Sequence, residues 1–578
     1  MNIIKFLFYL GLLGTSEVQG FAQRNGVSSQ LAPDEYGALI GIYAQTSGAS
    51  WMHRDGWLDP NATNWFGVTI DGVEFDSLGN VLVPGHVVRL FLSQNEMAGS
   101  FPPQVFDLKH LVELDLSGDD LTGSLSETLT NLDGLQNLNL RQNQLSGDIP
   151  SFLSALLSLR HLILSANQFT GNVPAALGSL TNLQELRLDW NQLTGDIPSE
   201  LQHLAKLESL NLSGNPLGCS ISAFVGSLTN LVSLDLSSDQ LVGEIPNVLG
   251  DLVNLTSLSL DGNQLSGLVP SELGNMRNLV NLGLARNQLT GELPDTLGRL
   301  GYLSFLDVGN NGLTGSIPTT FGDLAALEYL YLEQNQLSGQ IPGSLGNLGR
   351  LIALFAYENQ LSGDLPDSFG QLTNLIYLHL ASNCLGGRVP ELFGRMSSLD
   401  SLRLSNNQIS GSIPPTLGML TNMHTLDLAD NRLTGVVPGD LGKCLALNWC
   451  SLAGNALQGP VPDFSRSGVL GYLDLSRNCL DLTGPSLQSI QRMLDKPMAV
   501  IYLPQEFMIG AIYSTNGHLI IPWNAMPGRT YRVQYKTSLA ESEWHAVGDP
   551  VCAAGCTAMV LDYDGMNSDR FYRILLEP

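Results

Sequence analysis

Seven ring-bearing side chains near the middle of the chain have types and spacings suited to molecular recognition. They recur in steps of about 24 residues, although aromatic residues make up only 7% of the sequence. Such rings can stack on sugars or pack against apolar groups, and large exposed apolar patches usually mark interaction sites. The seven residues are Phe305, Tyr329, Tyr331, Phe355, Tyr357, Tyr377 and His379.

Catalytic chemistry has no comparable support in the sequence. None of the nine histidines begins an HExxH motif, and there is no GxSxG motif and no kinase signature. LGKCL at 441–445 comes nearest to a phosphate loop, but Cys444 replaces the magnesium-binding Ser or Thr and Val437 replaces the upstream glycine. We therefore expect no enzyme activity, no cofactor and no metal ion. The alternative is a hydrolase that uses a pair of acidic residues and has no recognisable sequence motif.

Cysteine pairing offers one further candidate. Cys552 and Cys556 in VCAAGC could close a small loop as a disulfide, and Cys444 and Cys450 are also near in sequence, although spacing alone settles neither pairing. No histidine cluster accompanies these cysteines, so metal binding is less favoured. Seven cysteines in 578 residues are too few to be the main support of the fold, so packing must hold it together.

An internal repeat positions the seven rings. The pattern LxxLxLxxNxLxGxIPxxLGxLxN returns every 24 residues, and its marker asparagine steps from Asn95 to Asn455 in 15 intervals. Only Asp119 and Asp239 break this series, and one more unit places Asn478 after a step of 23. The sequence therefore predicts 17 repeat units between residues 87 and 482.

Each unit predicts a short strand followed by a turn. The leucines of LxLxx face inward and the residues between them face outward, so stacked units form a parallel sheet. The marker asparagine can satisfy buried backbone groups of the neighbouring unit as both donor and acceptor. Because an aspartate lacks the amide donor, Asp119 and Asp239 should be slightly weaker joints, and we interpret them as structural.

These repeats resemble the plant-specific class of leucine-rich repeats. The hallmark LxGxIP stretch reads LSGDIP at 145–150, LTGSIP at 313–318 and ISGSIP at 409–414. The resemblance covers about 400 residues and implies a right-handed α/β-type solenoid whose concave strand face is the usual ligand surface, as in receptor ectodomains and polygalacturonase-inhibiting proteins. Residues 23–86 resemble the amino-terminal cap of that family, but NWFGVTI at 64–70 lacks the usual cysteines, as in bacterial or algal versions.

The two ends of the chain predict further segments. MNIIKFLFYLGLLG is a signal-peptide pattern over 1–22, with cleavage after Ala22 or Gly20 and a retained anchor as the alternative. No later apolar run is long enough for a stable transmembrane anchor. Residues 483–498 should form a helical cap, and 499–578 a small all-β sandwich that resembles a fibronectin type III module. We expect the mature protein to be secreted or at the cell surface.

The repeat register places the seven rings on outward positions of consecutive strands, about 4.8 Å apart, so they should form one patch. Packing of the rings on one another, with no ligand, is the alternative. Asp307, Glu328, Glu333 and Glu358 share these strands, which would suit a basic, partly apolar peptide or stacked sugars. Arg187, Asp189 and Trp190 form a second, weaker cluster.

Overall charge narrows the class of partner. The sequence holds 54 acidic and 27 basic residues, for a formal net charge of -27, which repels phosphate backbones and argues against nucleic acid. We predict a non-catalytic extracellular protein that recognises a protein, peptide or polysaccharide on its concave repeat face. The alternative is a structural or adhesive surface protein attached through the carboxy-terminal module.

Overall fold

The computed structural model describes residues 30–59, 62, 64–75, 81–481, 485–494, 500–502, 512–515, 518–524, 530–538, 543–553, 557–563 and 570–576. The predicted signal peptide at 1–22 lies outside these residues. The chain divides into two compact units, Met1–Leu193 and Thr194–Pro578, and the division falls inside the predicted repeat region. Within the described ranges, no helix combines the length and apolar character that a membrane crossing requires.

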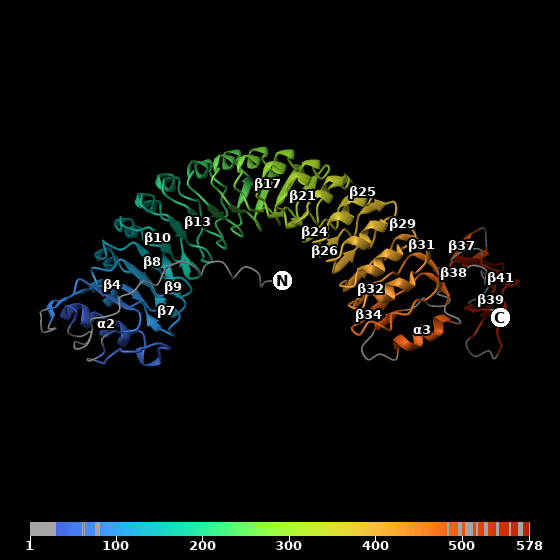
Figure 1. The fold of residues 1–578 in the computed structure, drawn as a ribbon, viewed down its shortest axis with the longest axis horizontal. Coiled ribbons are helices and arrows are strands. Elements are labelled where there is room, and N and C mark those ends of the chain that lie inside the picture. The colour runs from blue at the N-terminus through green and yellow to red at the C-terminus, as the bar shows by residue number, and fades with distance from the viewer. Residues whose placement is uncertain are drawn as a thin grey trace. The chain divides into compact units, whose positions relative to one another are not determined.

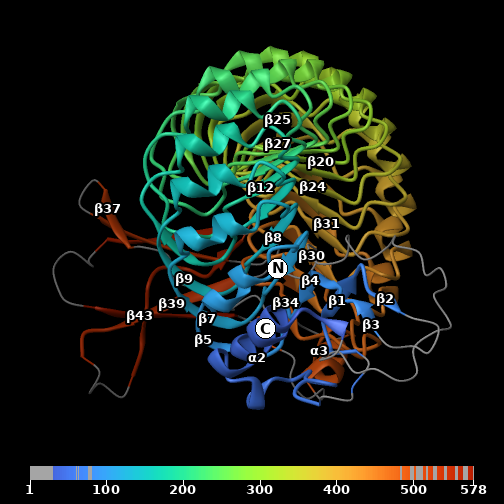
Figure 2. The same cartoon turned by 90° about the vertical axis from the view of Figure 1, so that its left-hand side faces the viewer.

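Each unit is built on a parallel sheet with one short strand per repeat (Figures 1 and 2). In the first unit these strands are β4 (His86–Phe91), β6 (Glu113–Asp115), β8 (Asn137–Asn139), β10 (His161–Ile163) and β12 (Glu185–Arg187). In the second unit they are β13 (Ser209–Asn211), β14 (Ser233–Asp235), β16 (Ser257–Ser259), β18 (Asn281–Gly283), β20 (Phe305–Asp307), β22 (Tyr329–Tyr331), β24 (Ala353–Phe355), β26 (Tyr377–His379), β28 (Ser401–Arg403), β30 (Thr425–Asp427), β32 (Trp449–Ser451) and β34 (Tyr472–Asp474). The predicted α/β solenoid is confirmed.

A second set of short parallel strands follows the marker residues. In the first unit they are β5 (Ala98–Ser100), β7 (Asp120–Gly123), β9 (Gln144–Asp148) and β11 (Gln168–Thr170). In the second unit they are β15 (Val242–Glu244), β17 (Gln264–Leu268), β19 (Gln288–Glu292), β21 (Gly312–Thr314), β23 (Ser338–Gln340), β25 (Gln360–Asp364), β27 (Cys384–Gly386), β29 (Ser410–Gly411), β31 (Arg432–Val436), β33 (Ala456–Pro460) and β35 (Cys479–Asp481).

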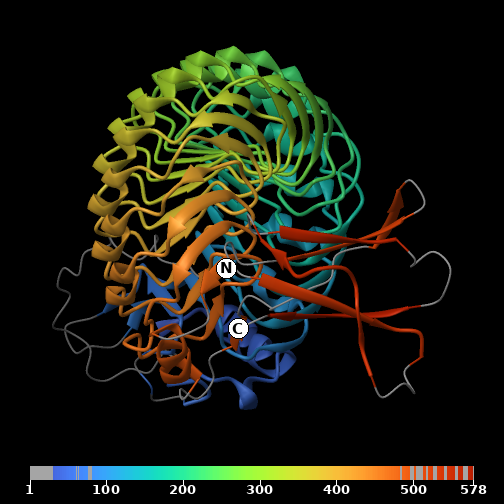
Figure 3. The same ribbon diagram turned by 90° about the vertical axis from the view of Figure 1, so that its right-hand side faces the viewer.

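Each repeat then makes one turn of 3-10 helix. In the first unit these turns are η2 (Pro103–Asp107), η3 (Glu127–Asn131), η4 (Ser151–Ala155) and η5 (Ala175–Ser179). In the second they are η6 (Ser199–His203), η7 (Ala223–Ser227), η8 (Asn247–Asp251), η9 (Ser271–Asn275), η10 (Asp295–Arg299), η11 (Thr319–Asp323), η12 (Gly343–Asn347), η13 (Asp367–Gln371), η14 (Glu391–Arg395), η15 (Pro415–Met419) and η16 (Gly439–Lys443). Within the second unit, the main strands line the inner side of the curve and the helical turns its outer side (Figures 1 and 3).

The repeating leucines and asparagines account for this stacking. Leu330 and Leu332 are fully buried, whereas Tyr329 and Tyr331 between and beside them are half-buried on the other face of the strand. The amide of Asn335 donates to the carbonyl of Val308 one coil earlier at 2.9 Å and to that of Leu332 at 3.2 Å, and its oxygen accepts from the backbone N–H of Leu313. The predicted role of the marker residue is confirmed.

The first unit begins with the helix α2 (Pro33–Gln45), η1 (Gly48–Ser50) and the strands β1 (Val68–Asp71), β2 (Glu74–Phe75) and β3 (Val81–Val83), within the segment expected to be a cap. Strand β1 pairs antiparallel with β4 and so closes one edge of the repeat sheet. Trp51, Trp57 and Trp65 are buried together there, with ring centroids 4.8 Å apart in each adjoining pair. The N–H and C=O groups on this side of β4 are therefore already paired within the unit.

The helix expected after the last repeat is present as α3 (Pro485–Leu494). The strand that follows, β36 (Val500–Tyr502), pairs in parallel with β34 and therefore belongs to the repeat sheet. The boundary expected at 499 is corrected by this pairing, because alternating sequence alone does not show whether a strand extends the solenoid or starts a new sheet.

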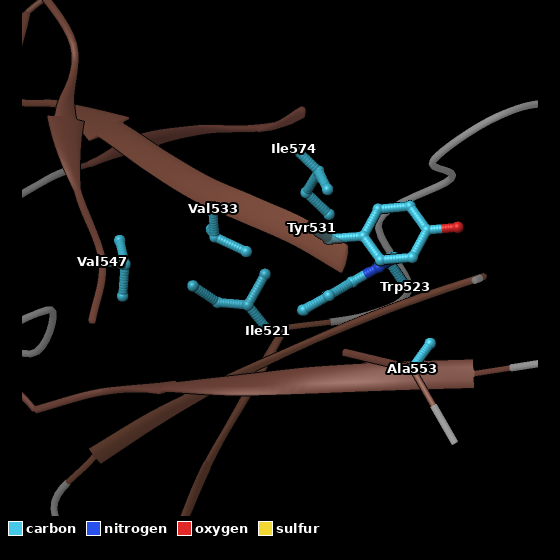
Figure 4. Close-up of a cluster of buried hydrophobic side chains, with 7 residues drawn as sticks. All are labelled: Ile521, Trp523, Tyr531, Val533, Val547, Ala553 and Ile574. Carbon is cyan, nitrogen blue, oxygen red and sulfur yellow. The ribbon is translucent and has the colours of Figure 1, made fainter. Parts of the chain in front are cut away.

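The remaining strands form two small antiparallel sheets with one buried core. They are the small carboxy-terminal β module that the sequence predicts. One contains β37 (Tyr513–Thr515), β38 (His518–Asn524) and β42 (Thr557–Asp562); the other contains β39 (Thr530–Lys536), β40 (His545–Ala546), β41 (Val551–Cys552) and β43 (Phe571–Leu576). Their core packs Trp523, Tyr531 and Val533 with Ile521 and Ile574 (Figure 4). The similarity of this module to fibronectin type III stays a prediction.

Candidate functional site: a ring patch on the repeat sheet

The parallel register of four strands brings the seven rings together. Phe305 on β20 pairs with Tyr329 on β22, Tyr331 with Phe355 on β24, and Phe355 with His379 on β26. Tyr377 shares β26, and Tyr357 follows β24. Because parallel neighbours in register present side chains at the same height on one face, residues 24 apart in sequence become neighbours. We call these seven residues the ring patch.

Continuous ring contacts join the whole patch. The centroids of Phe305 and Tyr331 are 5.5 Å apart, and those of Tyr331 and Phe355 are 5.1 Å apart. Phe355 lies parallel to His379 at 4.5 Å and edge-on to Tyr377 at 6.3 Å. Aromatic pairs with centroids 4.5–7 Å apart attract each other beyond their buried area, so the patch is preorganised.

Ala353 takes the place of a ring in the row of paired residues that otherwise contains Phe305, Tyr329 and Tyr377. Ala353 is buried between Tyr329 and Tyr377, so those two rings join only through Tyr331 and Phe355. Tyr377 is 38% exposed, and the other six side chains are half-buried. The rings therefore pack on one another and still present part of their surface to solvent, which keeps both the recognition and the packing interpretations open.

Acidic groups gather at one side of the patch. Burial raises the pKa of Asp307 to about 7, aided by the nearby charges of Asp261 and Glu333 and opposed by the Gly309 N–H and by Arg286. Burial also raises the pKa of Glu333, one of whose oxygens is buried without a hydrogen-bond partner in the described structure. These carboxyls would be stabilised in their charged form by a cation.

Two glycines make room beside these carboxyls. A Cβ at Gly309 would lie 3.0 Å from the Cδ of Glu333 and 3.3 Å from Oδ1 of Asp307, and a Cβ at Gly283 would collide with a carboxylate oxygen of Asp261. The absence of side chains at these positions therefore lets the acidic groups occupy the face of the sheet.

The ring patch is poorly suited to proton transfer near neutral pH. Burial, with nearby tyrosine and carboxyl charges, raises the pKa of Tyr331 to about 12, and burial also raises that of Tyr357. Burial and the charge of Arg403 lower the pKa of His379 to about 4, and its Nε2 lies 2.8 Å from the Ser401 hydroxyl. Protonated phenols and a neutral imidazole offer hydrogen bonds and ring faces, which serve binding.

Sequence reasoning found the rings but missed part of their surroundings. Asp307 and Glu333 were expected on these strands, whereas Asp261, Arg286 and the two glycines were not. Listing all outward positions by their offset from the marker residue would have found Asp261 and the two glycines, because Asp261, Gly309 and Glu333 share one offset and Gly283 and Asp307 another. Arg286 directly precedes its marker, Asn287, and lies outside these positions. Of the other expected carboxyls, Glu358 accepts from the Gln334 amide at 2.9 Å, and Glu328 is half-buried.

The second expected cluster, Arg187, Asp189 and Trp190, lies in the first unit, and its polar contacts are made within the repeats. Asp189 is buried, accepts from the Ser165 hydroxyl at 2.5 Å and lies 3.6 Å from the Nε of Arg187. Trp190 is 66% exposed and makes no ring contact among the described residues. This arrangement presents one isolated indole.

The expected disulfide between Cys552 and Cys556 is not seen. Cys552 is an exposed free thiol, and Cys556 lies outside the described residues. Cys552 ends β41 in pairing register with Thr530, so its position is set by the sheet. Cys444 and Cys450 are also free and buried, whereas Cys479 is disulfide-bonded.

Comparison with known proteins agrees with this architecture. Models described as a leucine-rich repeat region and as leucine-rich repeats match residues 319–446, 157–217, 277–337, 134–156 and 254–276. No curated protein matches the sequence. The chain belongs to the leucine-rich-repeat family.

Among solved structures, the plant peptide hormone receptor RGFR1 in complex with RGF2 is 32% identical, with a TM-score of 0.63 over 68% of this chain and 70% of the receptor chain. The Arabidopsis receptor kinase HAESA, in complex with the peptide hormone IDA and the co-receptor SERK1, is 29% identical, with a TM-score of 0.59 over 78% and 82%. A leucine-rich-repeat protein of Leptospira interrogans is 29% identical, with a TM-score of 0.53 over 72% and 95%.

Proposed function

We propose that this protein is a non-catalytic extracellular recognition protein that binds a peptide or a protein segment on the concave strand face of its second unit. The observation that carries the proposal is the ring patch, in which seven half-exposed or exposed rings contact one another across four consecutive strands. The similarity to receptors solved with peptide hormones supports a peptide partner.

The chemistry of the patch defines the partner. Its rings offer flat apolar surface, and Asp307 and Glu333 offer carboxyls that a cation would stabilise. A partner with apolar side chains next to a lysine, an arginine or a free amino terminus would match both features. The excess of acidic residues over the whole chain, 54 against 27 basic residues, attracts such a partner from a distance.

The test compares the wild-type protein with a triple variant, Tyr329→Ala, Tyr331→Ala, Phe355→Ala, as baits in the native extracellular medium. The matched control is Trp449→Ala, Tyr472→Ala, which removes another ring pair, stacked at 3.7 Å on β32 and β34 of the same sheet, of which Trp449 is exposed and Tyr472 half-buried. We expect a partner that is retained by the wild type and the control and lost by the triple variant. Circular dichroism verifies that all three proteins fold.

Retention of the same partner by the folded triple variant would contradict the proposal and would assign the rings to packing. Loss of the partner from both variants would place recognition over a longer stretch of the sheet than the ring patch and would also contradict it in this form.

A further inference from the structure

Three potential metal ligands meet in the first unit, away from the ring patch. Glu35 lies in α2, His86 begins β4, and His110 lies in the turn between η2 and β6. One donor atom from each side chain lies within 4.8 Å of the others. Among the residues that the structure describes, this is the one group of three such side chains that meets this distance.

The donor atoms of Glu35 and His86 are already about as far apart as two ligands of one metal ion. Oε1 of Glu35 lies 3.2 Å from Nδ1 of His86. Zinc binds carboxylate oxygen and imidazole nitrogen at about 2.0–2.1 Å, so two adjacent ligands of a tetrahedral site are about 3.4 Å apart. An ion could therefore enter between these two atoms with little movement of either side chain.

The surrounding protein fixes the carboxylate. Glu35 is only 3% exposed, and its Oε2 accepts a hydrogen bond from the backbone N–H of Val87 at 2.9 Å. A buried carboxylate whose second oxygen is held by the backbone is oriented as the ligands of metal sites usually are. The bond also leaves Oε1 beside Nδ1 of His86.

The repeat places the second imidazole beside the first. His110 follows His86 by 24 residues, which is one repeat, and the two ring centroids are 3.7 Å apart. His110 is exposed, so its ring can rotate and bring a nitrogen to the ion without disturbing the core. Among charged residues, Asp71 is the cross-strand partner of His86, and Asp34 and Lys109 adjoin Glu35 and His110 in sequence.

We propose that Glu35, His86 and His110 bind a late first-row transition-metal ion, with zinc as its representative. Two imidazoles and one carboxylate are a ligand set that suits zinc, and the exposed sides of the two histidines leave a fourth position for water. The ion would join α2 of the cap to the first two repeat coils and would stabilise that end of the unit. This site is independent of the proposed recognition function.

The test is calorimetric titration of zinc chloride into the tag-free protein, after EDTA treatment and removal of the chelator. We expect one ion per wild-type chain. His110→Ala should weaken binding at least roughly tenfold, because even the loss of an outer contact to a metal ligand commonly has that effect. The matched control is His424→Ala, which removes a histidine that pairs with one carboxylate, that of Asp400, among the described residues.

Two further measurements make the result independent of folding defects. Zinc should raise the melting temperature of the wild type and of His424→Ala but not of His110→Ala, since an ion that binds the native state stabilises it. Glu35→Gln keeps an oxygen for the Val87 N–H and removes the charge, so it should fold and bind zinc weakly. The proposal is overturned if the wild type takes up no zinc, or if folded His110→Ala binds as tightly as the wild type.

Discussion

At the scale of single residues, the marker position shows how one atom changes a joint between coils. Asn143 donates its amide to the carbonyls of Leu116 at 2.8 Å and Leu140 at 3.2 Å. Asp119, one coil earlier, accepts from the N–H groups of Asn95 and Met97 through Oδ1, but its Oδ2 is buried with no hydrogen-bond partner in the described structure. An ionised oxygen there lacks the donor that the asparagine amide supplies.

Asp119→Asn should therefore stabilise the protein at pH 8. Burial raises the pKa of Asp119 from 3.8 to about 6, so the folded state holds this proton more tightly than the unfolded state does. The protonated carboxyl therefore stabilises the folded state fully below pH 3.8. This stabilisation is lost as the pH rises through 6, which lowers the free energy of unfolding by up to roughly 3 kcal/mol. Thermal melts followed by circular dichroism should show a higher melting temperature for the variant at pH 8 and a much smaller gain at pH 4.

Asn143→Asp provides the matched control, because it makes the reverse substitution one coil later, removes the amide that donates to Leu116 and Leu140, and should lower the melting temperature at pH 8. A lower melting temperature for Asp119→Asn at pH 8 would show that the carboxylate is better accommodated than the asparagine. The sequence predicted the weaker joint from the missing donor. It could not predict the raised pKa, which depends on how deeply the folded coils bury this oxygen.

Asp307 makes a second residue-scale prediction, which concerns binding. Its pKa of about 7 means that the carboxyl gains its negative charge between pH 6 and pH 8. A basic partner on the ring patch should therefore bind more tightly at pH 8 than at pH 6, by roughly fivefold for about 1 kcal/mol of charge interaction. Surface plasmon resonance at both pH values measures the ratio. Asp307→Asn should reduce it toward one, and an unchanged ratio would exclude Asp307 from the contact.

At the scale of elements, glycine sets how closely the helical turns of successive coils approach. A Cβ at Gly346 in η12 would lie 2.5 Å from the Cβ and 2.7 Å from the carbonyl oxygen of Ser368 in η13. Corresponding glycines in the neighbouring turns meet the next coil in the same way, as at Gly322 and Gly370. The recurrent glycine of the LGxL pattern is thus required by packing between coils.

Gly346→Ala should destabilise the protein by roughly 1–3 kcal/mol, because the added methyl group forces two packed turns apart. Gly349→Ala is the control, since nothing lies within 4 Å of a Cβ at that position. Chemical denaturation of both variants beside the wild type measures the difference. Equal midpoints for the two variants would mean that the coils adjust without cost.

The elements also show the extent and the limit of prediction from sequence. The strands of the main sheet follow from LxLxx, since alternate leucines must be buried. The second strands, such as Gln360–Asp364, were not predicted, because their outward residues are polar and their pairing is with the next coil. The Glu35, His86 and His110 cluster was also missed: Glu35 lies 51 residues before His86, and only the folded cap brings it there.

At the scale of the whole molecule, net charge should control how fast a partner arrives. The formal charge of -27 surrounds the chain with a negative field, which acts over about 10 Å at 0.1 M salt and over much less at higher salt. The ring contacts of the patch act only after contact and are nearly independent of salt. Charge therefore governs the association rate, and the rings govern the dissociation rate.

Raising the salt concentration from 50 to 500 mM should slow association of a basic partner roughly tenfold or more and leave its dissociation rate nearly unchanged. The triple variant Tyr329→Ala, Tyr331→Ala, Phe355→Ala should show the opposite behaviour, with the same salt dependence of association and faster dissociation. Stopped-flow or surface plasmon resonance kinetics separate the two rates. If salt changes dissociation and leaves association constant, the partner is held by direct ion pairs at the site, and the long-range field has no part in its capture.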